Sequence, residues 1–201
     1  MKELVYYTRL YGRLAAQHIK ARMVYRVHFA ISLVGMLAIN IVSLATIWLI
    51  FRSIDEVAGW SYEEIIFIYG FSLLVASPSN ICFDNLWQLG AKLISGEFIK
   101  YYYRPLNILF YFLAERVDMK SFSHLVVAVG VMVYASQNLE VTWTIGKAMA
   151  FILLFITSSL IVIAIMLIAS ASAFWIMVPN YALLLAVKLK DFSHYPIGIY
   201  S

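Results

Sequence analysis

The feature that most constrains this chain is a run of 23 residues, Phe29 to Phe51, that contains no charged side chain. A helix needs roughly 20 apolar residues to cross a bilayer, and only helices or closed barrels satisfy their backbone hydrogen bonds there. The composition agrees, since 63% of the residues are hydrophobic, 13% are charged and the mean hydropathy is +0.84. A water-soluble domain would need a more highly charged surface. The run therefore predicts a transmembrane helix.

Further apolar runs predict the other spans of a polytopic, all-α transmembrane helix bundle. They lie at about 65–83, 119–139 and 148–172, with residues 178–200 as a candidate fifth span. Lys188, Lys190 and Asp191 interrupt the fifth run, and such charges are costly at mid-bilayer unless they face an interface or a protein interior. Pro78 lies inside the second run and predicts a kink at 77–80, where neighbouring helices can satisfy the carbonyl that it leaves free. One transmembrane domain, residues 1–201, is the simplest organisation.

Lysine and arginine alternate strongly between the segments that separate these runs. Residues 1–28 carry six, 52–64 one, 84–120 five and 140–147 one. Because basic loops stay on the cytoplasmic side, the N-terminus and the segment 84–118 are predicted to lie inside. The net charge of +4 does not predict nucleic-acid binding, since the basic residues sit between long apolar runs and form no contiguous basic surface.

Residues 1–28 predict an amphipathic helix on the membrane surface. With successive side chains about 100° apart, its basic residues fall on one side and its apolar residues on the other. The basic set is Lys2, Arg9, Arg13 and Lys20, and the apolar set is Leu4, Tyr7, Leu10, Tyr11 and Leu14. Tyrosines at headgroup level and a basic face toward an anionic leaflet favour contact with the lipid bilayer. The alternative is a soluble helix packed on a partner domain.

The segment 84–118 is too long for a passive connector and therefore predicts a function of its own. We expect helix to continue from the second span through Ile94, a break at Ser95 and Gly96, and a short element that Arg104 and Pro105 end. Such a rigid protrusion, with Glu97, Phe98 and Ile99 at its tip, can dock in a groove of a soluble partner. The alternative is an amphipathic loop that rests on the lipid surface.

Several groups of residues, in this order and spacing, resemble the type 2 ATP-binding-cassette permeases, and within them the small single-domain bacterial permeases. The groups are Ala58 to Ser61 with Glu64, Tyr69 and Gly70; Asn85 to Trp87; Gly96 to Phe98; Arg104 to Asn107; Ala114 to Arg116 with Asp118; Ser172 to Trp175; and Phe192, Tyr195, Pro196, Ile199 and Tyr200. Two features depart from that pattern. Family members often have aspartate where Ile99 stands, and their chains continue beyond Pro196 into a final span, so the sequence is expected to be a fragment or a shortened copy.

The resemblance implies a permease subunit of an ATP-driven exporter in the bacterial plasma membrane. It implies that Gly96, Glu97, Phe98, Arg104 and Pro105 contact an ATP-binding-cassette ATPase subunit, and that a second permease subunit completes the transporter. No G-x-x-x-x-G-K-[ST] run occurs in the sequence, so ATP is expected on the ATPase subunit and no cofactor or metal in this chain. The first, second and fourth spans carry hydroxyl and amide side chains without charge, which favours an amphipathic or hydrophobic substrate.

Two other classes of function remain open on the sequence alone. A membrane-embedded enzyme would draw on Glu115, Arg116, Asp118 and His124, although the four histidines show no metal-ligand spacing and no nucleophile motif accompanies them. We expect Glu115, Arg116 and Asp118 to form ion pairs where the third span starts. A passive channel, or an anchoring subunit of another membrane complex, is the third class.

Overall fold

The computed structural model describes residues 2–23, 26–139, 141–176 and 180–194. Within these ranges it has helices and no strand, which confirms the predicted all-α bundle. The α-helices are α1 (Lys2–Met23), α2 (Arg26–Phe51), α3 (Tyr62–Cys82), α4 (Leu89–Ile94), α5 (Ile108–Ala114), α6 (Phe122–Asn138), α7 (Ile145–Ala171) and α8 (Tyr181–Asp191). The 3-10 helices are η1 (Asp84–Gln88), η2 (Glu97–Tyr101), η3 (Met119–Ser121), η4 (Ser172–Phe174) and η5 (Phe192–His194).

Four helical segments are long and apolar enough to cross a membrane: Phe29–Phe51, Tyr62–Cys82, Met119–Asn138 and Ile145–Phe174. The second begins three residues earlier than the uncharged run suggested. Ser61 and Glu64 form a capping box there, in which the serine hydroxyl accepts from the Glu64 N–H at 3.4 Å and the Glu64 carboxylate accepts from the Ser61 N–H at 2.9 Å. Acidic residues also suit the positive end of a helix, so Glu63 and Glu64 belong to its first turn.

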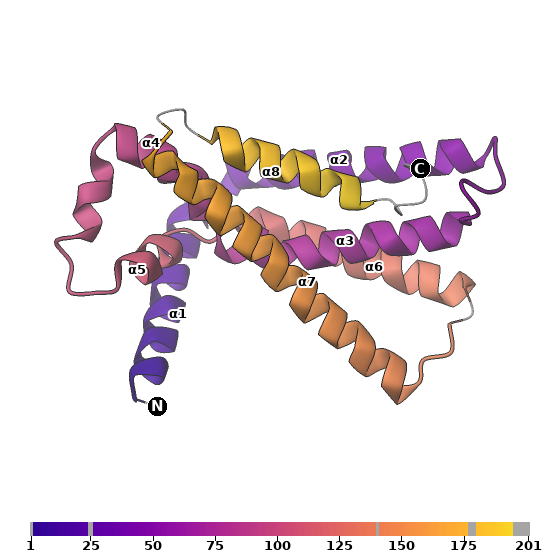
Figure 1. Cartoon of the computed structure of the whole chain (residues 1–201), viewed down its shortest axis with the longest axis horizontal. Helices are drawn as coiled ribbons and strands as arrows, with labels where there is room; N and C mark the ends of the chain where they lie inside the picture. Colours follow the sequence, from indigo (N-terminus) through magenta and orange to yellow (C-terminus); the bar gives the residue numbers. More distant parts are fainter. Residues whose placement is uncertain (1, 24–25, 140, 177–179, 195–201) are drawn as a thin grey trace.

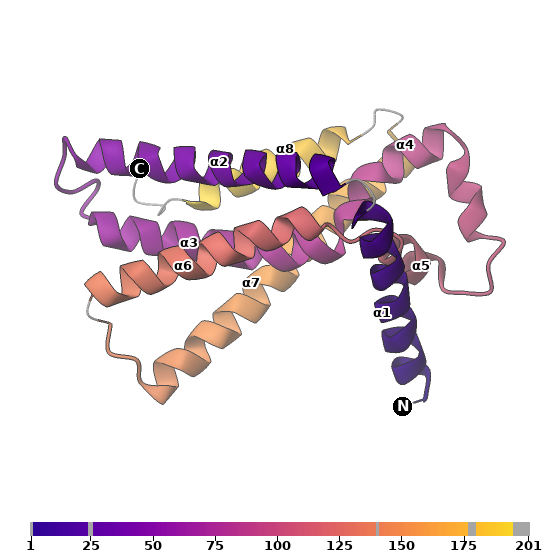
Figure 2. The same cartoon turned by 180° about the vertical axis from the view of Figure 1, so that it is seen from behind.

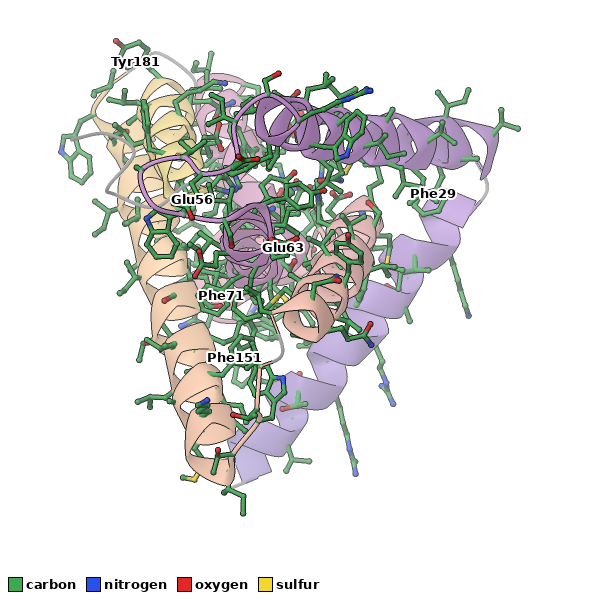
Figure 3. All side chains as sticks on the ribbon, turned by 90° about the vertical axis from the view of Figure 1, so that its right-hand side faces the viewer. Phe29, Glu56, Glu63, Phe71, Phe151 and Tyr181 are labelled. Carbon is green, nitrogen blue, oxygen red and sulfur yellow. The ribbon has the colours of Figure 1, made fainter. Side chains whose placement is uncertain are left out.

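Helix α3 occupies the centre of the bundle and contacts α2, α6 and α7 (Figures 1 and 2). Its Gly70 lies against α6, where a Cβ atom would stand 2.7 Å from Met132 Cγ and 3.3 Å from the Ala128 carbonyl oxygen. On the α7 side, Phe71 and Phe151 meet with ring centroids 5.4 Å apart (Figure 3). The helix is continuous through Pro78, and Ser159 of α7 donates a hydrogen bond to the Val75 carbonyl at 3.1 Å. The predicted kink at 77–80 stays a prediction.

The two ends of the bundle differ. Helices α4 and α5, the end of α1 and the starts of α2 and α8 lie at one end, and the α2–α3 and α6–α7 connections lie at the other (Figures 1 and 2). The two most basic segments of the sequence therefore share an end, as the alternation of lysine and arginine requires.

Helix α1 leaves the bundle at a steep angle (Figure 1). Its Arg9 and Arg13 are exposed, whereas Tyr7 is half-buried and packs on Phe110 of α5 with ring centroids 4.7 Å apart. The amphipathic division predicted for residues 1–28 is thus present along α1, although the helix ends at Met23. Its contact with a lipid surface stays a prediction, and the side chains of Lys2 and Leu4 lie outside the described part.

The candidate fifth span at 178–200 is described only in part. Helix α8 has 11 residues, which corresponds to about 16 Å at 1.5 Å per residue and is half of a hydrocarbon core of about 30 Å. It begins at the same end as α4 and runs back toward the middle of the bundle (Figure 1). Residues 177–179 and 195–201 lie outside the described ranges.

Candidate functional site

The residues that the sequence singled out lie in the loop module, which we define as residues 84–118. Helix α3 ends at Cys82, and the chain bends through η1 into α4, so the predicted continuous helix through Ile94 is wrong. The break at Gly96 is observed: its φ of 74° lies in the left-handed region that glycine adopts without a Cβ clash, and η2 starts at the next residue. The module then returns through α5 to the start of α6.

A single carboxylate, that of Glu115 at the end of α5, holds the module together. Its Oε1 lies 2.6 Å from the Lys100 ammonium and its Oε2 lies 2.5 Å from the Lys92 ammonium. The Tyr101 hydroxyl also donates to Oε2. One side chain thus joins α4, η2 and α5, three elements that share no secondary-structure hydrogen bonds.

The protonation of this cluster follows from its contacts. Burial raises the pKa of Glu115, but hydrogen bonds from Lys100, Lys92 and Tyr101 outweigh burial and hold the pKa at about 2. Burial lowers the pKa of Lys92, and its bond to Glu115 opposes that effect. Burial and the bond to Glu115 both raise the pKa of Tyr101. At neutral pH the carboxylate is therefore ionised and the tyrosine is a donor.

Asn85 of η1 joins the start of the module to α4 and α5. It is 1% exposed, donates to the Phe112 carbonyl at 2.5 Å and accepts from the Lys92 ammonium at 3.2 Å. Beside it, Asp84 forms an ion pair with Arg116. The N–H of Asp118 donates to the carbonyl of Ile81 at 3.1 Å. Two contacts thus join η1 to the end of the module, and the Asp118 bond joins the module to the last turn of α3.

Phe98 packs inside the module. Its ring lies 5.2 Å from that of Tyr101, 6.0 Å from that of Phe112 and 5.6 Å from that of Phe174, which belongs to η4 at the end of α7. Phe98 is half-buried between these rings, and its expected contact with a partner stays a prediction. Phe98 connects the module to α7.

The other residues proposed for the contact are exposed. Glu97, Arg104 and Pro105 lie at the surface with Gly96, and the Arg104 guanidinium stacks over Tyr111 with 4.8 Å to the ring centroid. Large apolar side chains accompany them on the outside of the module, and we call these four the tip residues: Ile94, 61% exposed; Ile99, 57%; Tyr102, 64%; and Tyr103, 79%. Sequence reasoning named Ile99 but not the other three.

The candidate residues of the enzyme hypothesis do not converge. Glu115 lies in the centre of the module, Arg116 pairs with Asp84, and the Asp118 carboxylate accepts from the Ser121 hydroxyl at 2.8 Å at the start of η3. His124 contacts Asn40 of α2, with 3.1 Å between Nδ1 and the amide nitrogen. Among the described residues, no three His, Cys, Asp or Glu side chains gather as a metal site. The expected ion pairs at Glu115 and Arg116 exist, with partners inside the module.

Apolar helices around α3, and a charge-linked module at one end that exposes apolar side chains, define a multi-pass membrane protein of the permease class. A family model described as ABC-2 family transporter protein matches residues 17–201. The chain belongs to that family, which confirms the resemblance to type 2 permeases and makes it the membrane subunit of an ABC transporter. Membership implies that it works with an ABC ATPase subunit. The comparisons with curated proteins and with solved structures gave no match.

Proposed function

We propose that this permease exports an amphipathic or hydrophobic compound and receives the force for export through the loop module. The ATPase subunit binds ATP and contacts Glu97, Arg104, Pro105 and the tip residues, while Gly96 sets their direction. A second permease subunit, a copy of this chain or a sister chain, completes the path. The transporter lies in the bacterial plasma membrane with its N-terminus in the cytoplasm, which the alternation of basic loops supports.

The observation that carries the coupling role is the Glu115 cluster. A contact surface transmits a displacement only if it is rigid and fastened to what must move. Glu115 holds η2 to α5, the Asp118 N–H holds the end of the module to the Ile81 carbonyl of α3, and Phe98 holds η2 to Phe174 at the end of α7. A push on the tip residues therefore reaches α3 and α7, the two helices joined by the Ser159 hydrogen bond.

The composition of the exposed tip suits contact with a groove of another protein better than contact with water. Four large apolar side chains stand beside charged residues, which is the composition of a protein contact with an apolar centre and a polar rim. A loop that merely rested on lipid would also expose apolar groups. The distinction is experimental, because only an ATPase contact makes recovery of that subunit depend on these side chains.

The test is co-purification of the ATPase with the detergent-solubilised permease from its native membrane. The test variant is Ile99→Asp with Tyr103→Asp, which places charges at the tip without touching the Glu115 cluster. The matched control is Ile54→Asp with Ile145→Asp at the opposite end, where Ile54 of the α2–α3 connection is 52% exposed and Ile145, the first residue of α7, is 81% exposed. Removal of central contacts typically weakens an interface by a factor of about 30, so we expect the ATPase to be lost from the tip variant and kept by the control.

Phe98→Ala separates packing from contact. Because Phe98 fills an internal cluster, its truncation should lower both the stability of the permease and ATPase recovery, whereas the tip variant should lower recovery alone. Equal ATPase recovery by the tip variant and the opposite-end control would reject the proposed contact.

A further inference from the structure

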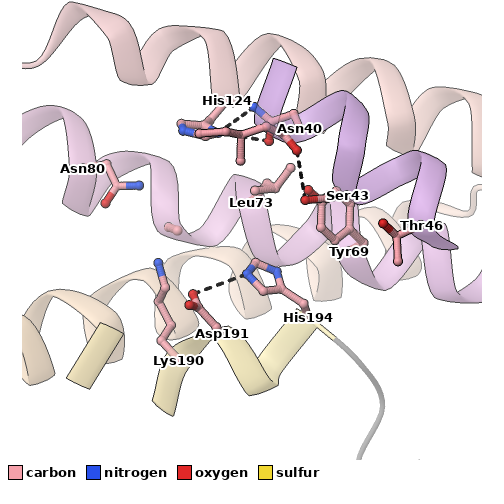
Figure 4. A pocket seen from close by; sticks show the side chains of 12 residues that line it. Asn40, Ser43, Thr46, Tyr69, Leu73, Asn80, His124, Lys190, Asp191 and His194 are labelled. Carbon is pink, nitrogen blue, oxygen red and sulfur yellow. Dashed lines mark hydrogen bonds and ion pairs between the residues drawn. The ribbon is translucent and has the colours of Figure 1, made fainter. Parts of the chain in front are cut away.

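A polar pocket lies inside the membrane bundle, between α2 and α6 on one side and α8 with η5 on the other, and α3 forms its floor (Figure 4). Its volume is about 500 Å³. The side chains that matter below are Asn40, Asn80, His124, Lys190, Asp191 and His194. The uncharged runs in the sequence supply its amides, and its ionisable groups come from α6 and from the segment that follows α7. Ionisable groups among membrane helices are costly and usually mark a functional path.

The wall formed by α2 and α6 is held in place by hydrogen bonds. Asn40 is 2% exposed, donates to the Met36 carbonyl at 2.9 Å and contacts His124 Nδ1 at 3.1 Å. This pair fixes the two helices relative to each other and turns an amide and an imidazole toward the pocket (Figure 4). Both groups can form hydrogen bonds with a ligand.

The opposite wall carries the charges. Nδ1 of His194 lies 2.5 Å from the Ser72 hydroxyl, which anchors η5 to α3. Nε2 of the same ring lies 3.7 Å from one carboxylate oxygen of Asp191, and the Lys188 ammonium lies 3.9 Å from the other. Asp191 thus faces basic groups of its own segment. Lys190 extends from α8 toward α3 with its ammonium in the pocket, on the side of Asn80 (Figure 4).

An apolar groove of about 580 Å³ adjoins this pocket between α3, α7 and α8. Phe71, Val75, Ile161 and Leu185 contribute to its lining, and Lys190 lines both spaces. Lysine has a long apolar stem and a charged end, so one residue can border an apolar groove and still present its ammonium to a polar pocket. The two spaces together match a molecule with a compact polar head and an apolar body.

We propose that the polar pocket binds the anionic head, a carboxylate or phosphate, of an amphipathic molecule whose apolar part lies in the adjoining groove. This inference rests on the proposed export function and names the class of its substrate. A charged donor in a low-dielectric setting gains most from an anion, and amides and imidazoles add hydrogen bonds to its oxygens. Asp191 also attracts Lys190, but Lys188 and His194 neighbour the same carboxylate, so an anionic head can share Lys190 with it.

The test measures equilibrium binding of radiolabelled dodecyl phosphate to the full chain in phosphatidylcholine nanodiscs, with empty discs subtracted. Competition by dodecanol reports the apolar part alone, and competition by inorganic phosphate reports the anion alone. Lys190→Met removes the charge and keeps an apolar stem, so affinity should fall about tenfold or more. Lys190→Arg should retain binding. The matched control, Lys147→Met, removes an exposed lysine at the far end of α7 and should bind as the unaltered chain does.

Asn80→Ala is a second variant in case Lys190→Met does not fold, and it should weaken dodecyl phosphate binding while leaving dodecanol competition unchanged. Equal affinity of Lys190→Met and Lys147→Met would overturn the proposal. Inorganic phosphate that competes as well as dodecyl phosphate would also overturn it, because the site would then take a free anion. The binding measurement needs no ATPase, so the two proposals can fail separately. If the tip variant loses the ATPase but dodecyl phosphate affinity does not depend on Lys190, this site is rejected and the coupling function is kept.

Discussion

The bundle around α3 and the loop module are held together by different forces. In the bundle, half of the apolar stretch of α3 is buried. Gly70, which has no side chain, lets α3 pack closely against α6. In the module, the joints are made by a carboxylate, two ammonium groups, a phenol and an amide. The bundle depends on shape and the module depends on charge.

The difference follows from the two solvents. Lipid tails are as apolar as the helices that they surround, so helices associate through close packing and a few hydrogen bonds. Only 11% of the apolar stretch of α2, and 11% of that of α7, is accordingly buried inside the bundle. Both helices leave most of their apolar surface to lipid. The module packs short elements around an apolar cluster that includes Leu86, Tyr101 and Phe112, and charges that satisfy one another join these elements. The predictions below test this division.

The largest effect is expected from Glu115→Gln, which removes the charge of the cluster and keeps its size. Lys92, whose side chain is 14% exposed, would be left buried without its counter-ion. Removal of one partner from a fully buried pair costs about 3 kcal/mol or more, so for this partly buried cluster we expect a loss of about 2 to 3 kcal/mol. Stability is measured by unfolding the detergent-solubilised chain with SDS. The control Glu97→Gln, at an exposed carboxylate of the same module, should change stability little, and an equal loss in both would refute a charge-held module.

Gly70→Leu should have the next largest effect, because it attacks shape without changing charge. A Cβ added at residue 70 would stand 2.7 Å from Met132 Cγ, and the larger leucine side chain would crowd α6 further. Overpacking of this kind costs about 2 kcal/mol. Gly35→Ala in α2 is the control, since no atom lies within 4 Å of its added Cβ. SDS unfolding of both variants, and of Gly70→Leu with Met132→Ala, measures the effect. A failure of Met132→Ala to restore any stability would place the strain elsewhere.

A smaller effect is expected on acidification. The pKa of Glu115 is depressed from 4.5 to about 2, so its contribution to stability is complete above pH 4.5 and is lost as the pH falls toward 2. Because the group is partly exposed, we expect a loss of order 1 kcal/mol between pH 5 and pH 3. Thermal unfolding in detergent across this range measures it. The Glu115→Gln variant lacks the group and should show a shallower decline, and parallel curves would count against the assignment.

The bundle was easier to predict from the sequence than the module. Uncharged runs report spans directly, because the thickness of a bilayer sets the length of the helix. The prediction placed the start of α3 at residue 65 because the uncharged run begins there, although a capping box puts Glu63 and Glu64 in the first turn. Gly96 was predictable because its position in a sharp break requires a residue without Cβ.

The contacts inside the module have no comparable signal. Glu115 meets Lys92 and Lys100 across 23 and 15 residues, and no periodicity links such positions. The inward orientation of Phe98 depends on Phe174, which lies beyond two membrane helices in the sequence. The polar pocket likewise combines α2, α6 and the segment after α7, so its charges could be seen in the sequence but their shared location could not.

The smallest effect is expected from Ser159→Ala. This variant tests whether packing, and not a polar contact, holds the helices of the bundle together. Ser159 is 6% exposed and donates from α7 to the Val75 carbonyl of α3 at 3.1 Å. Hydrogen bonds between membrane helices contribute about 0.6 kcal/mol on average, so SDS unfolding should register a loss near that size. Thr157→Ala is the control, because its hydroxyl bonds only to carbonyls of its own helix. A loss from Ser159→Ala as large as that from Gly70→Leu would mean that polar contacts, and not shape, hold α7 to α3.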